Sequence, residues 1–125
     1  MNLLLDTHVL LWWLNDDPQL SARARELIGN SKNISAVSAA TIWEIWIKER
    51  LKKIQLPRNF REVLEAQSFQ DLPITSEHAH AMHFLPPHHR DPFDRMLIVQ
   101  SQVEGLTLVT HDARIQQYDV EAVVV

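Results

Sequence analysis

The sequence predicts an α/β fold in which helices pack on a mostly parallel sheet of about five strands. Two observations lead to this fold class: short apolar segments alternate with helical segments along the chain, and some of the apolar segments contain no polar residue. Size is a third observation, because 125 residues of which 46% are hydrophobic can bury a substantial core. With two glycines and no low-complexity segment, residues 1–125 are expected to form a single domain.

Five short apolar segments are the expected strands of this sheet. Strands that helices cover on both faces need no polar face, so their sequences tend to be continuously apolar rather than alternating. In chain order the expected strands are Leu3–Leu5, Ile34–Val37, Leu72–Ile74, Leu106–Val109 and Ala122–Val125.

Helical segments fill the intervals between these strands, and residues that favour helix ends support several of them. The expected helices lie near His8–Leu14, Ala22–Asn30, Ala39–Lys52, Phe60–Gln67, Glu77–Phe84, Pro92–Glu104 and Ala113–Tyr118. Ser21, Asn59 and Asp91 are predicted N-caps, because their short polar side chains can accept a hydrogen bond from a free backbone N–H. Gly105 is predicted to end its helix in a left-handed conformation just before the next strand.

Four acidic residues lie where an apolar strand and a helix meet: Asp6, Glu44, Asp94 and Asp112. In a parallel sheet, the carboxyl ends of the strands and the amino ends of the following helices share one edge, where such folds bind ligands. Carboxylates gathered there would repel one another by about 4 kcal/mol per pair at about 4 Å and an effective dielectric constant of about 20. Because a divalent cation would relieve this repulsion, the pattern predicts a metal-dependent hydrolase.

Each acid also has a structural explanation when it is considered alone. Asp6 and Asp112 could cap helices, and Asp94 could stabilise a helix amino end. Glu44 could pair with Lys48 one turn later, although a carboxylate between Trp and Ile neighbours needs a partner or a metal. The shared placement of all four acids favours one site over four separate structural roles.

Four motifs in the correct order resemble those of the PIN-domain family over essentially the whole chain. The run Leu3–Thr7 resembles the opening of a PIN domain, and Ser38–Glu44 resembles the family's second motif. Asp94, followed by an apolar helix and then by Gly105–Asp112, resembles the third and fourth motifs. The small members that the chain looks like are the VapC-type toxins of toxin–antitoxin pairs. The resemblance implies a three-layer α/β/α sandwich and Mg²⁺- or Mn²⁺-dependent hydrolysis of RNA phosphodiester bonds.

The resemblance also implies a catalytic metal site made by the same four acids. Asp6 and Asp94 are the expected direct ligands, and Glu44 and Asp112 are expected to act through water. Three hydroxyl residues beside the acids are expected to orient carboxylates or water: Thr7, Ser38 and Thr110. The substitution Asp6→Asn is expected to abolish cleavage with little loss of stability, because it removes one repelling charge.

Two neighbours of Asp94 leave alternatives open. Asp91 lies three residues earlier and could replace or assist Asp94. The eleven residues from Asp94 to Gly105 fit the family spacing, so Asp91 is expected to cap the helix. His88 and His89 lie on a proline-rich loop near Asp91 and could approach substrate phosphate, and among the seven histidines His89 is the best candidate for a catalytic or ligand role.

Net charge, cysteine content and hydropathy exclude several classes of function and indicate where the protein is located. A net charge of −4 argues against a non-specific nucleic-acid coat, although the basic stretch Lys48–Arg61 could contact phosphate or merely solvate a helix end. The absence of cysteine excludes disulfides and thiolate metal sites and fits a cytoplasmic protein. No apolar run is long enough to span a bilayer, and the first residues lack the basic segment of a secretory signal.

Two other enzyme classes fit the sequence poorly. A haloacid-dehalogenase-type phosphotransferase would need an aspartate where His8 stands, and a Rossmann nucleotide binder would need glycines after the first strand. The remaining alternative is a PIN-like interaction module without enzymatic activity, whose acidic site is vestigial. The presence of all four acids favours the enzyme.

The tryptophans predict protein partners. Trp43 and Trp46 flank Glu44 on a helix whose apolar residues cover nearly its whole circumference, and Trp12 and Trp13 are adjacent on the first helix. One sheet cannot cover all of this surface, although burial on several sides within the same domain is an alternative. We therefore expect a homodimer and a groove for an antitoxin segment, from which an Arg or Lys could enter the acidic pocket.

Overall fold

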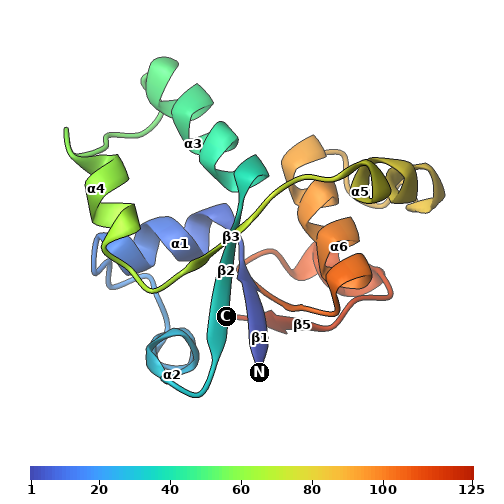
Figure 1. Ribbon diagram of the computed structural model, residues 1–125, viewed down its shortest axis with the longest axis horizontal. Helices are drawn as coiled ribbons and strands as arrows, with labels where there is room; N and C mark the ends of the chain where they lie inside the picture. Colours follow the sequence, from blue (N-terminus) through green and yellow to red (C-terminus); the bar gives the residue numbers. More distant parts are fainter.

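A five-stranded parallel sheet forms the centre of the computed structural model, which describes residues 1–125 (Figure 1). The strands are β1 (Asn2–Leu5), β2 (Ile34–Ser38), β3 (Gln70–Leu72), β4 (Thr107–Thr110) and β5 (Ala122–Val124). Their spatial order is β3-β2-β1-β4-β5, and every pairing is parallel. The predicted α/β class is confirmed, and the sheet is wholly rather than mostly parallel.

Helices cover both faces of the sheet and form the outer two layers (Figure 1). One face is covered by α1 (Thr7–Leu14), α2 (Ala22–Gly29), α3 (Ala39–Arg50) and α4 (Phe60–Glu65). The other face is covered by α5 (Ser76–Ala81), α6 (Pro92–Glu104) and the short 3₁₀ helices η1 (Met82–Phe84) and η2 (Ala113–Gln117). None of these helices combines the length and apolar character needed to cross a membrane.

The central strand β1 contributes to the hydrophobic cores on both faces. Leu3 and Leu5 belong to the core cluster under α1–α4, whereas Leu4 belongs to the cluster under α6. Successive side chains of a strand point to opposite faces, so a run of leucines can fill both cores. All three are fully buried, and such burial contributes about 1.5–3 kcal/mol per side chain.

Most of the predicted helix ends are confirmed. Ser21 accepts a hydrogen bond from Ala24 N, and Asp91 accepts hydrogen bonds from the first turn of α6. Gly105 ends α6 in the left-handed conformation, with a φ of 67°. Asn59 stands at the N-cap position of α4 as predicted, but its backbone (φ −100°, ψ 34°) is not extended and its side chain makes no capping hydrogen bond.

The position of the third strand was also predicted wrongly. β3 covers Gln70–Leu72, whereas the apolar pattern predicts Leu72–Ile74, and Ile74 lies beyond the strand with 40% of its surface exposed. β3 pairs on only one side, with β2, so Gln70 and Asp71 are exposed at the sheet edge. An edge strand needs no continuous apolar run, and the apolar pattern therefore missed it.

The order of the inner strands decides which loops and helix starts meet. β1 lies between β2 and β4, so the carboxyl ends of these three strands lie at one edge of the sheet. Asp6 directly follows β1, α3 with Glu44 directly follows β2, and Asp112 follows β4. The sheet topology therefore brings three of the four acids to the same edge.

Candidate active site

Asp6 is almost completely buried and serves as a junction between the first strand, the first helix and β4. One carboxylate oxygen, Oδ1, accepts a hydrogen bond from Val9 N (2.8 Å) and so caps α1. The other, Oδ2, accepts hydrogen bonds from Thr110 Oγ1 (2.6 Å) and His111 N (3.0 Å). Asp6 is 3% exposed, and these donors supply the partners that a buried carboxylate requires.

Glu44 is buried between its apolar neighbours and has two polar partners. Thr7 Oγ1 donates a hydrogen bond to Glu44 Oε1 (2.5 Å), and Lys48 Nζ lies 3.1 Å from Glu44 Oε2. Because Thr7 directly follows Asp6 in the chain, this hydrogen bond connects the end of β1 with α3. The ion pair with Lys48 is the one that the sequence suggested for Glu44 alone.

Asp112 caps η2 and is linked to Asp6 through a shared threonine. Asp112 N donates to Thr110 Oγ1 (3.0 Å), and the same hydroxyl donates to Asp6. The guanidinium of Arg114 binds both carboxylate oxygens of Asp112. This contact, assisted by a hydrogen bond from His89, holds the pKa of Asp112 well below its usual range.

Asp94 carries the least compensated charge of the four acids. Burial, and then the nearby carboxylates of Asp91, Asp6 and Glu44, raise the pKa of Asp94 to about 7, although His89 opposes this shift. No Lys or Arg pairs with Asp94, in contrast to Asp112, the other partly exposed acid of the site. The electrostatic influence of Asp6 and Glu44 on Asp94 means that these acids share one region of the molecule.

Asp91 caps the helix that carries Asp94. Its Oδ1 accepts hydrogen bonds from Phe93 N (2.8 Å) and Asp94 N (3.3 Å). The structure thus places Asp91 at the cap that the spacing predicts, with Asp94 in the first turn of α6.

His89, the histidine that the sequence favours for a role at the site, lies between two of the acids. Its Nε2 is 2.8 Å from Asp112 Oδ2 and 3.2 Å from Asp94 Oδ2. His89 is 4% exposed, so its ring faces carboxylates rather than an open surface where substrate phosphate could reach it. The sequence signal for this placement is that His89 lies two residues before Asp91, the cap of the helix that carries Asp94.

Ser38 has a different environment from Thr7 and Thr110. Its fully buried hydroxyl accepts a hydrogen bond from Ala40 N (3.0 Å) and caps α3. Thr7 and Thr110 donate to Glu44 and Asp6, whereas the hydrogen bonds of Ser38 stay within its own helix start. Ser38 therefore reaches the acids only indirectly, by fixing the start of the helix that carries Glu44.

The donor set fits a divalent cation. Carboxylate oxygens of Asp94 and Asp112 lie within 4.8 Å of each other, and Asp94 lacks a Lys or Arg partner. Carboxylate oxygens without thiolates are the ligands that Mg²⁺ and Mn²⁺ prefer. The pKa of Asp94 is raised by carboxylates that a cation would compensate, so the residues present fit the implied metal.

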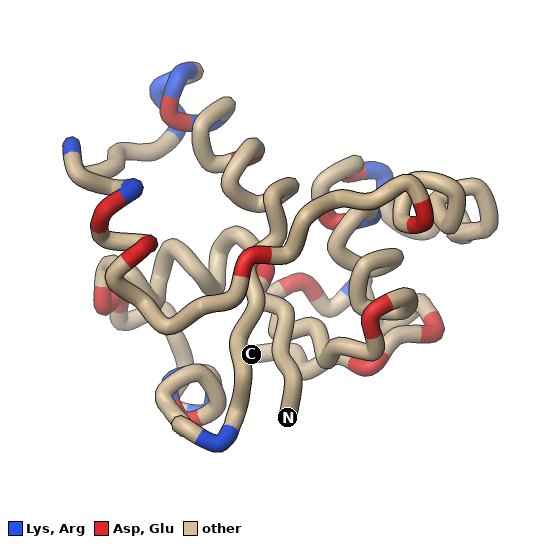
Figure 2. Tube along the Cα trace, viewed as in Figure 1, with Lys and Arg blue, Asp and Glu red and all other residues tan.

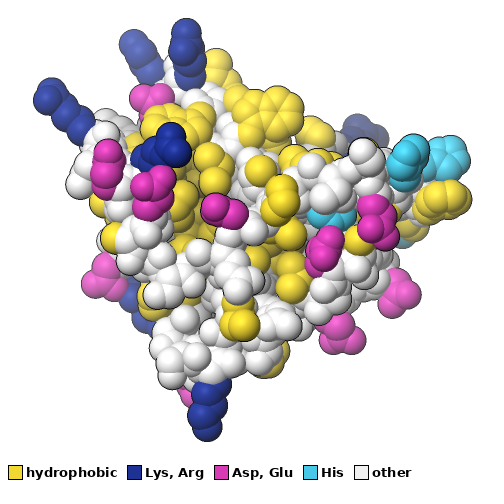
Figure 3. Space-filling model, viewed as in Figure 1, with side chains coloured by type: hydrophobic (Ala, Val, Ile, Leu, Met, Phe, Trp, Pro, Cys, Tyr) yellow, Lys and Arg dark blue, Asp and Glu magenta, His cyan; other side chains and the backbone are white.

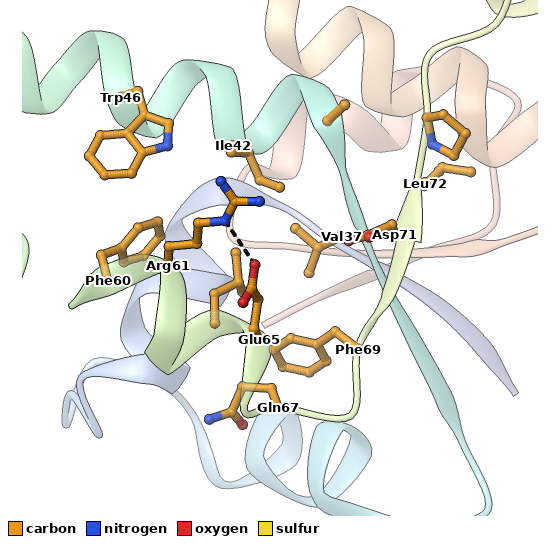
Figure 4. Close-up of a pocket in the computed structure, with 13 residues that line it drawn as sticks. Val37, Ile42, Trp46, Phe60, Arg61, Glu65, Gln67, Phe69, Asp71 and Leu72 are labelled. Carbon is orange, nitrogen blue, oxygen red and sulfur yellow. Dashed lines mark hydrogen bonds and ion pairs between the residues drawn. The ribbon is translucent and has the colours of Figure 1, made fainter.

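A separate apolar groove of about 670 Å³ lies between α3, α4 and the β2–β3 edge. None of the four acids lines it. Figure 3 shows hydrophobic side chains gathered over α3 and between α3 and α4, and Figure 4 shows Trp46 and Ile42 of α3 on the side of the groove opposite Phe69. An Arg61–Glu65 ion pair of 2.8 Å lies at its exposed rim. Apolar residues that line the groove include Val37, Ile42, Trp46, Phe60, Leu64 and Phe69.

Basic residues gather at one end of the molecule. Figure 2 shows the Lys and Arg positions at the far end of α3 and in the segment that leads into α4. Lys48 and Arg50 lie in the last turn of α3, where cations interact favourably with the helix dipole. Lys48 connects this basic end to the acidic site, because it is the partner of Glu44.

Comparisons with known proteins agree with this architecture. A family model described as the PIN domain matches residues 3–121. The chain is similar to ribonuclease VapC22 of Mycobacterium tuberculosis (strain ATCC 25618 / H37Rv), with 31% identity over 119 residues that cover 92% of this chain and 90% of that protein.

Two solved structures share the fold. One is VapBC2 from Rickettsia felis bound to a DNA fragment from its promoter, with a TM-score of 0.75, 15% identity, and coverage of 99% of this chain and 98% of that chain. The other is a toxin–antitoxin complex from Klebsiella pneumoniae, with a TM-score of 0.68, 17% identity, and coverage of 97% and 95%.

Proposed function

Because the chain belongs to the PIN-domain family and is related to the VapC-type ribonucleases, we propose that it is a metal-dependent endoribonuclease, the toxin of a toxin–antitoxin pair. The observation that carries this proposal is the close placement of the Asp94 and Asp112 carboxylates, together with the burial of Asp94, which with the nearby Asp91, Asp6 and Glu44 raises its pKa to about 7. Asp6, Glu44, Asp94 and Asp112 are the proposed catalytic residues, and Mg²⁺ or Mn²⁺ is the proposed cofactor.

The chain's own residues orient the reaction. Thr7 and Thr110 hold the carboxylates of Glu44 and Asp6, so these groups need no reorganisation when substrate binds. When bound, Mg²⁺ or Mn²⁺ supplies an acidified water and neutralises charge on the phosphate.

The four acids divide into two pairs by their partners. Glu44 and Asp112 already pair with Lys48 and Arg114, which fits roles through water. Asp94 has no such partner, and it fits a direct ligand role together with Asp6. The basic residues at the end of α3 would contact phosphates of the RNA on either side of the cleaved bond. The proposed site of action is the cytoplasm.

Metal removal is the first test of this function. Mn²⁺ at 100 times its dissociation constant is expected to stabilise the folded chain by about 2.7 kcal/mol, because it binds only the folded state. The melting temperature should therefore rise with Mn²⁺, and cleavage of a single-stranded RNA should stop when EDTA is added. Asp119→Asn, which changes an exposed acid elsewhere, is the control and should keep both responses.

The competing function is an interaction module with a vestigial acidic site. Such a module would show neither a rise in melting temperature with Mn²⁺ nor EDTA-sensitive cleavage. That result would reject the nuclease while leaving the fold unchanged.

Two apolar surfaces fit two different protein partners. The groove between α3 and α4 would accept an apolar segment of the antitoxin, and an Arg or Lys of that segment would pair with the carboxylates of the acidic site. Trp43 is 61% exposed on α3 and packs edge-to-face on Phe93 (ring centroids 5.3 Å apart), outside the groove. This second surface would form the homodimer interface. We propose that residues 1–125, to which both surfaces belong, form a single domain, and the two cores on one sheet support this.

Paired tryptophan variants separate the two partners. Trp43→Ala is expected to weaken the dimer by on the order of 2 kcal/mol, because buried aromatic anchors dominate such interfaces. Trp46 is 45% exposed and lines the groove. Trp46→Ala should therefore leave the dimer intact but weaken binding of the co-expressed cognate antitoxin by a similar amount. Sedimentation at micromolar concentration measures the dimer, and titration with purified antitoxin measures the complex. A strictly monomeric wild type would contradict the proposed homodimer, but it would not bear on the proposal that the groove binds the antitoxin.

A further inference from the structure

His89 is held so that one ring atom faces two of the proposed catalytic acids. We infer that it is a positioning residue: its Nε2–H ties Asp94 to Asp112 in the metal-free protein and thereby sets the affinity of the site for a divalent cation. This inference rests on the proposed function, since it concerns the same site.

The tautomer of His89 follows from its other ring nitrogen. Asp91 N donates a hydrogen bond to His89 Nδ1 (3.1 Å), so Nδ1 must present its lone pair. In the neutral ring the proton then lies on Nε2, which makes Nε2 a donor. Nε2 donates its hydrogen bond to Asp112 Oδ2 (2.8 Å), and Asp94 Oδ2 lies 3.2 Å from the same nitrogen, within ion-pairing distance. The same arrangement argues against His89 as a metal ligand, because no lone pair remains on the nitrogen that faces the acids.

The loop that carries His89 is anchored on both sides, so the ring has little freedom to turn away. His89 N donates to the hydroxyl of Tyr118 (2.7 Å), and that hydroxyl donates to Pro86 O (2.8 Å). Arg95 Nη1 donates to His89 O (3.1 Å) from the helix that carries Asp94. The loop that carries the imidazole is therefore fixed relative to both α6 and the end of η2.

A fixed donor between two carboxylates reduces their repulsion before any cation arrives. Asp94 lies in the first turn of α6 and is partly exposed, whereas Asp112 caps η2 and is held by Arg114. Without the shared donor, Asp94 would turn toward solvent and away from Asp112. Residues that orient metal ligands through hydrogen bonds typically contribute about 10- to 100-fold to metal affinity. His89 is expected to have an effect of this size.

Two substitutions at position 89 separate the donor function of Nε2 from the acceptor function of Nδ1. Gln at position 89 can place an amide N–H near the position of Nε2, and so keeps the donor to the acids. Asn at position 89 can place a carbonyl near the position of Nδ1, and so keeps the acceptor for Asp91 N. His89→Gln should therefore bind Mn²⁺ nearly as well as the wild type, whereas His89→Asn should bind it about 10- to 100-fold more weakly.

The test combines Mn²⁺ titration calorimetry on all three proteins with ¹⁵N NMR of the metal-free wild type. The expected result is a protonated Nε2 and an unprotonated Nδ1, together with rescue by Gln and not by Asn. A protonated Nδ1 would overturn the inference whatever the activity. Rescue by Asn and not by Gln would also overturn it, because His89 would then serve only to hold the start of α6.

Failure of the proposed function gives a different result. A wild type that binds no Mn²⁺ and cuts no RNA would reject the nuclease and the affinity effect together. A wild type that is an active, Mn²⁺-binding nuclease, with both variants binding Mn²⁺ as well as it does, would reject only the role of His89.

Discussion

Asp6→Asn is expected to abolish RNA cleavage and, in addition, to destabilise the fold. A carboxylate–cation attraction of about 4 kcal/mol at about 4 Å and an effective dielectric constant of about 20 corresponds to on the order of 10³-fold in rate. The stability effect comes from the three hydrogen bonds that the carboxylate accepts from Val9, Thr110 and His111. The Asn side chain replaces one of the two acceptor oxygens of Asp6 with an NH₂ group. This group would face Val9 N on one side or Thr110 and His111 on the other, and would leave those donors without an acceptor. Leaving buried donors unsatisfied costs about 1–3 kcal/mol.

Cleavage assays and thermal unfolding of the Asp6 variant check both parts. The expected loss of about 2 kcal/mol corresponds to a fall in melting temperature of roughly 5–10 °C. Asp119→Asn, at an exposed position, is the matched control and should change neither quantity. The sequence alone suggests little loss of stability for Asp6→Asn, and an unchanged melting temperature would favour that simpler expectation. Undiminished cleavage in a preparation free of contaminating nuclease would count against the mechanism.

Asp94→Asn is expected to abolish cleavage as well, but to stabilise the metal-free protein at neutral and alkaline pH. The pKa of Asp94 is raised from 3.8 to about 7 in the folded state, mainly by burial and then by neighbouring carboxylates. The folded protein thus binds this proton more tightly than the unfolded chain, and stability falls as pH rises from about 4 to about 7. Because Asn carries no charge at any of these pH values, the variant should not show this fall in the free energy of unfolding.

The pH profile of stability provides the measurement for Asp94. The free energy of unfolding of variant and wild type should be nearly equal near pH 4. Their difference should grow to a plateau above pH 7 on the order of 2 kcal/mol, since one pKa unit corresponds to about 1.4 kcal/mol and solvent screens a partly exposed carboxylate. Mn²⁺ should stabilise the wild type and not the variant. Parallel pH profiles for the two proteins would contradict the electrostatic account of Asp94.

The same chemical change at Asp6 and at Asp94 is therefore expected to shift stability in opposite directions. The difference lies in their partners, because Asp6 accepts three hydrogen bonds whereas Asp94 faces other carboxylates. Both variants should nevertheless lose cleavage. Loss of activity with opposite stability effects would separate a catalytic role from a folding defect.

The sequence predicted those features that depend on residues close to one another in the chain. The leucines of β1 mark a strand covered on both faces, and the Asp91 cap and Gly105 mark the ends of α6. β3 could not be located, since an edge strand paired on one side carries no continuous apolar run. Asn59 has the right residue type for a cap, but the local backbone has a conformation that residue type alone does not determine.

The details of the candidate site depend on contacts between distant parts of the chain. The positions of the four acids relative to strands and helices could be predicted from local patterns. The contact of His89 with Asp112 spans 23 residues, and that of Thr110 with Asp6 spans 104. No local pattern specifies such pairs, so the sequence could name Thr110 as a neighbour of an acid but not as the donor that joins two of them.

The pairing of β1 with β4 at the middle of the sheet affects when a newly made chain can complete its acidic site. Asp6 is synthesised at the start, but Thr110 and His111, which hold its carboxylate, follow 104 and 105 residues later. Until β4 has been translated and has joined β1, the chain carries Asp6, Glu44 and Asp94 without Asp112 and without the Thr110 hydroxyl that holds Asp6. Parallel pairing between distant segments is also intrinsically slow. Under the proposed function, a fragment that ends before residue 107 should cut no RNA, and a partner protein would have time to bind before the site is complete.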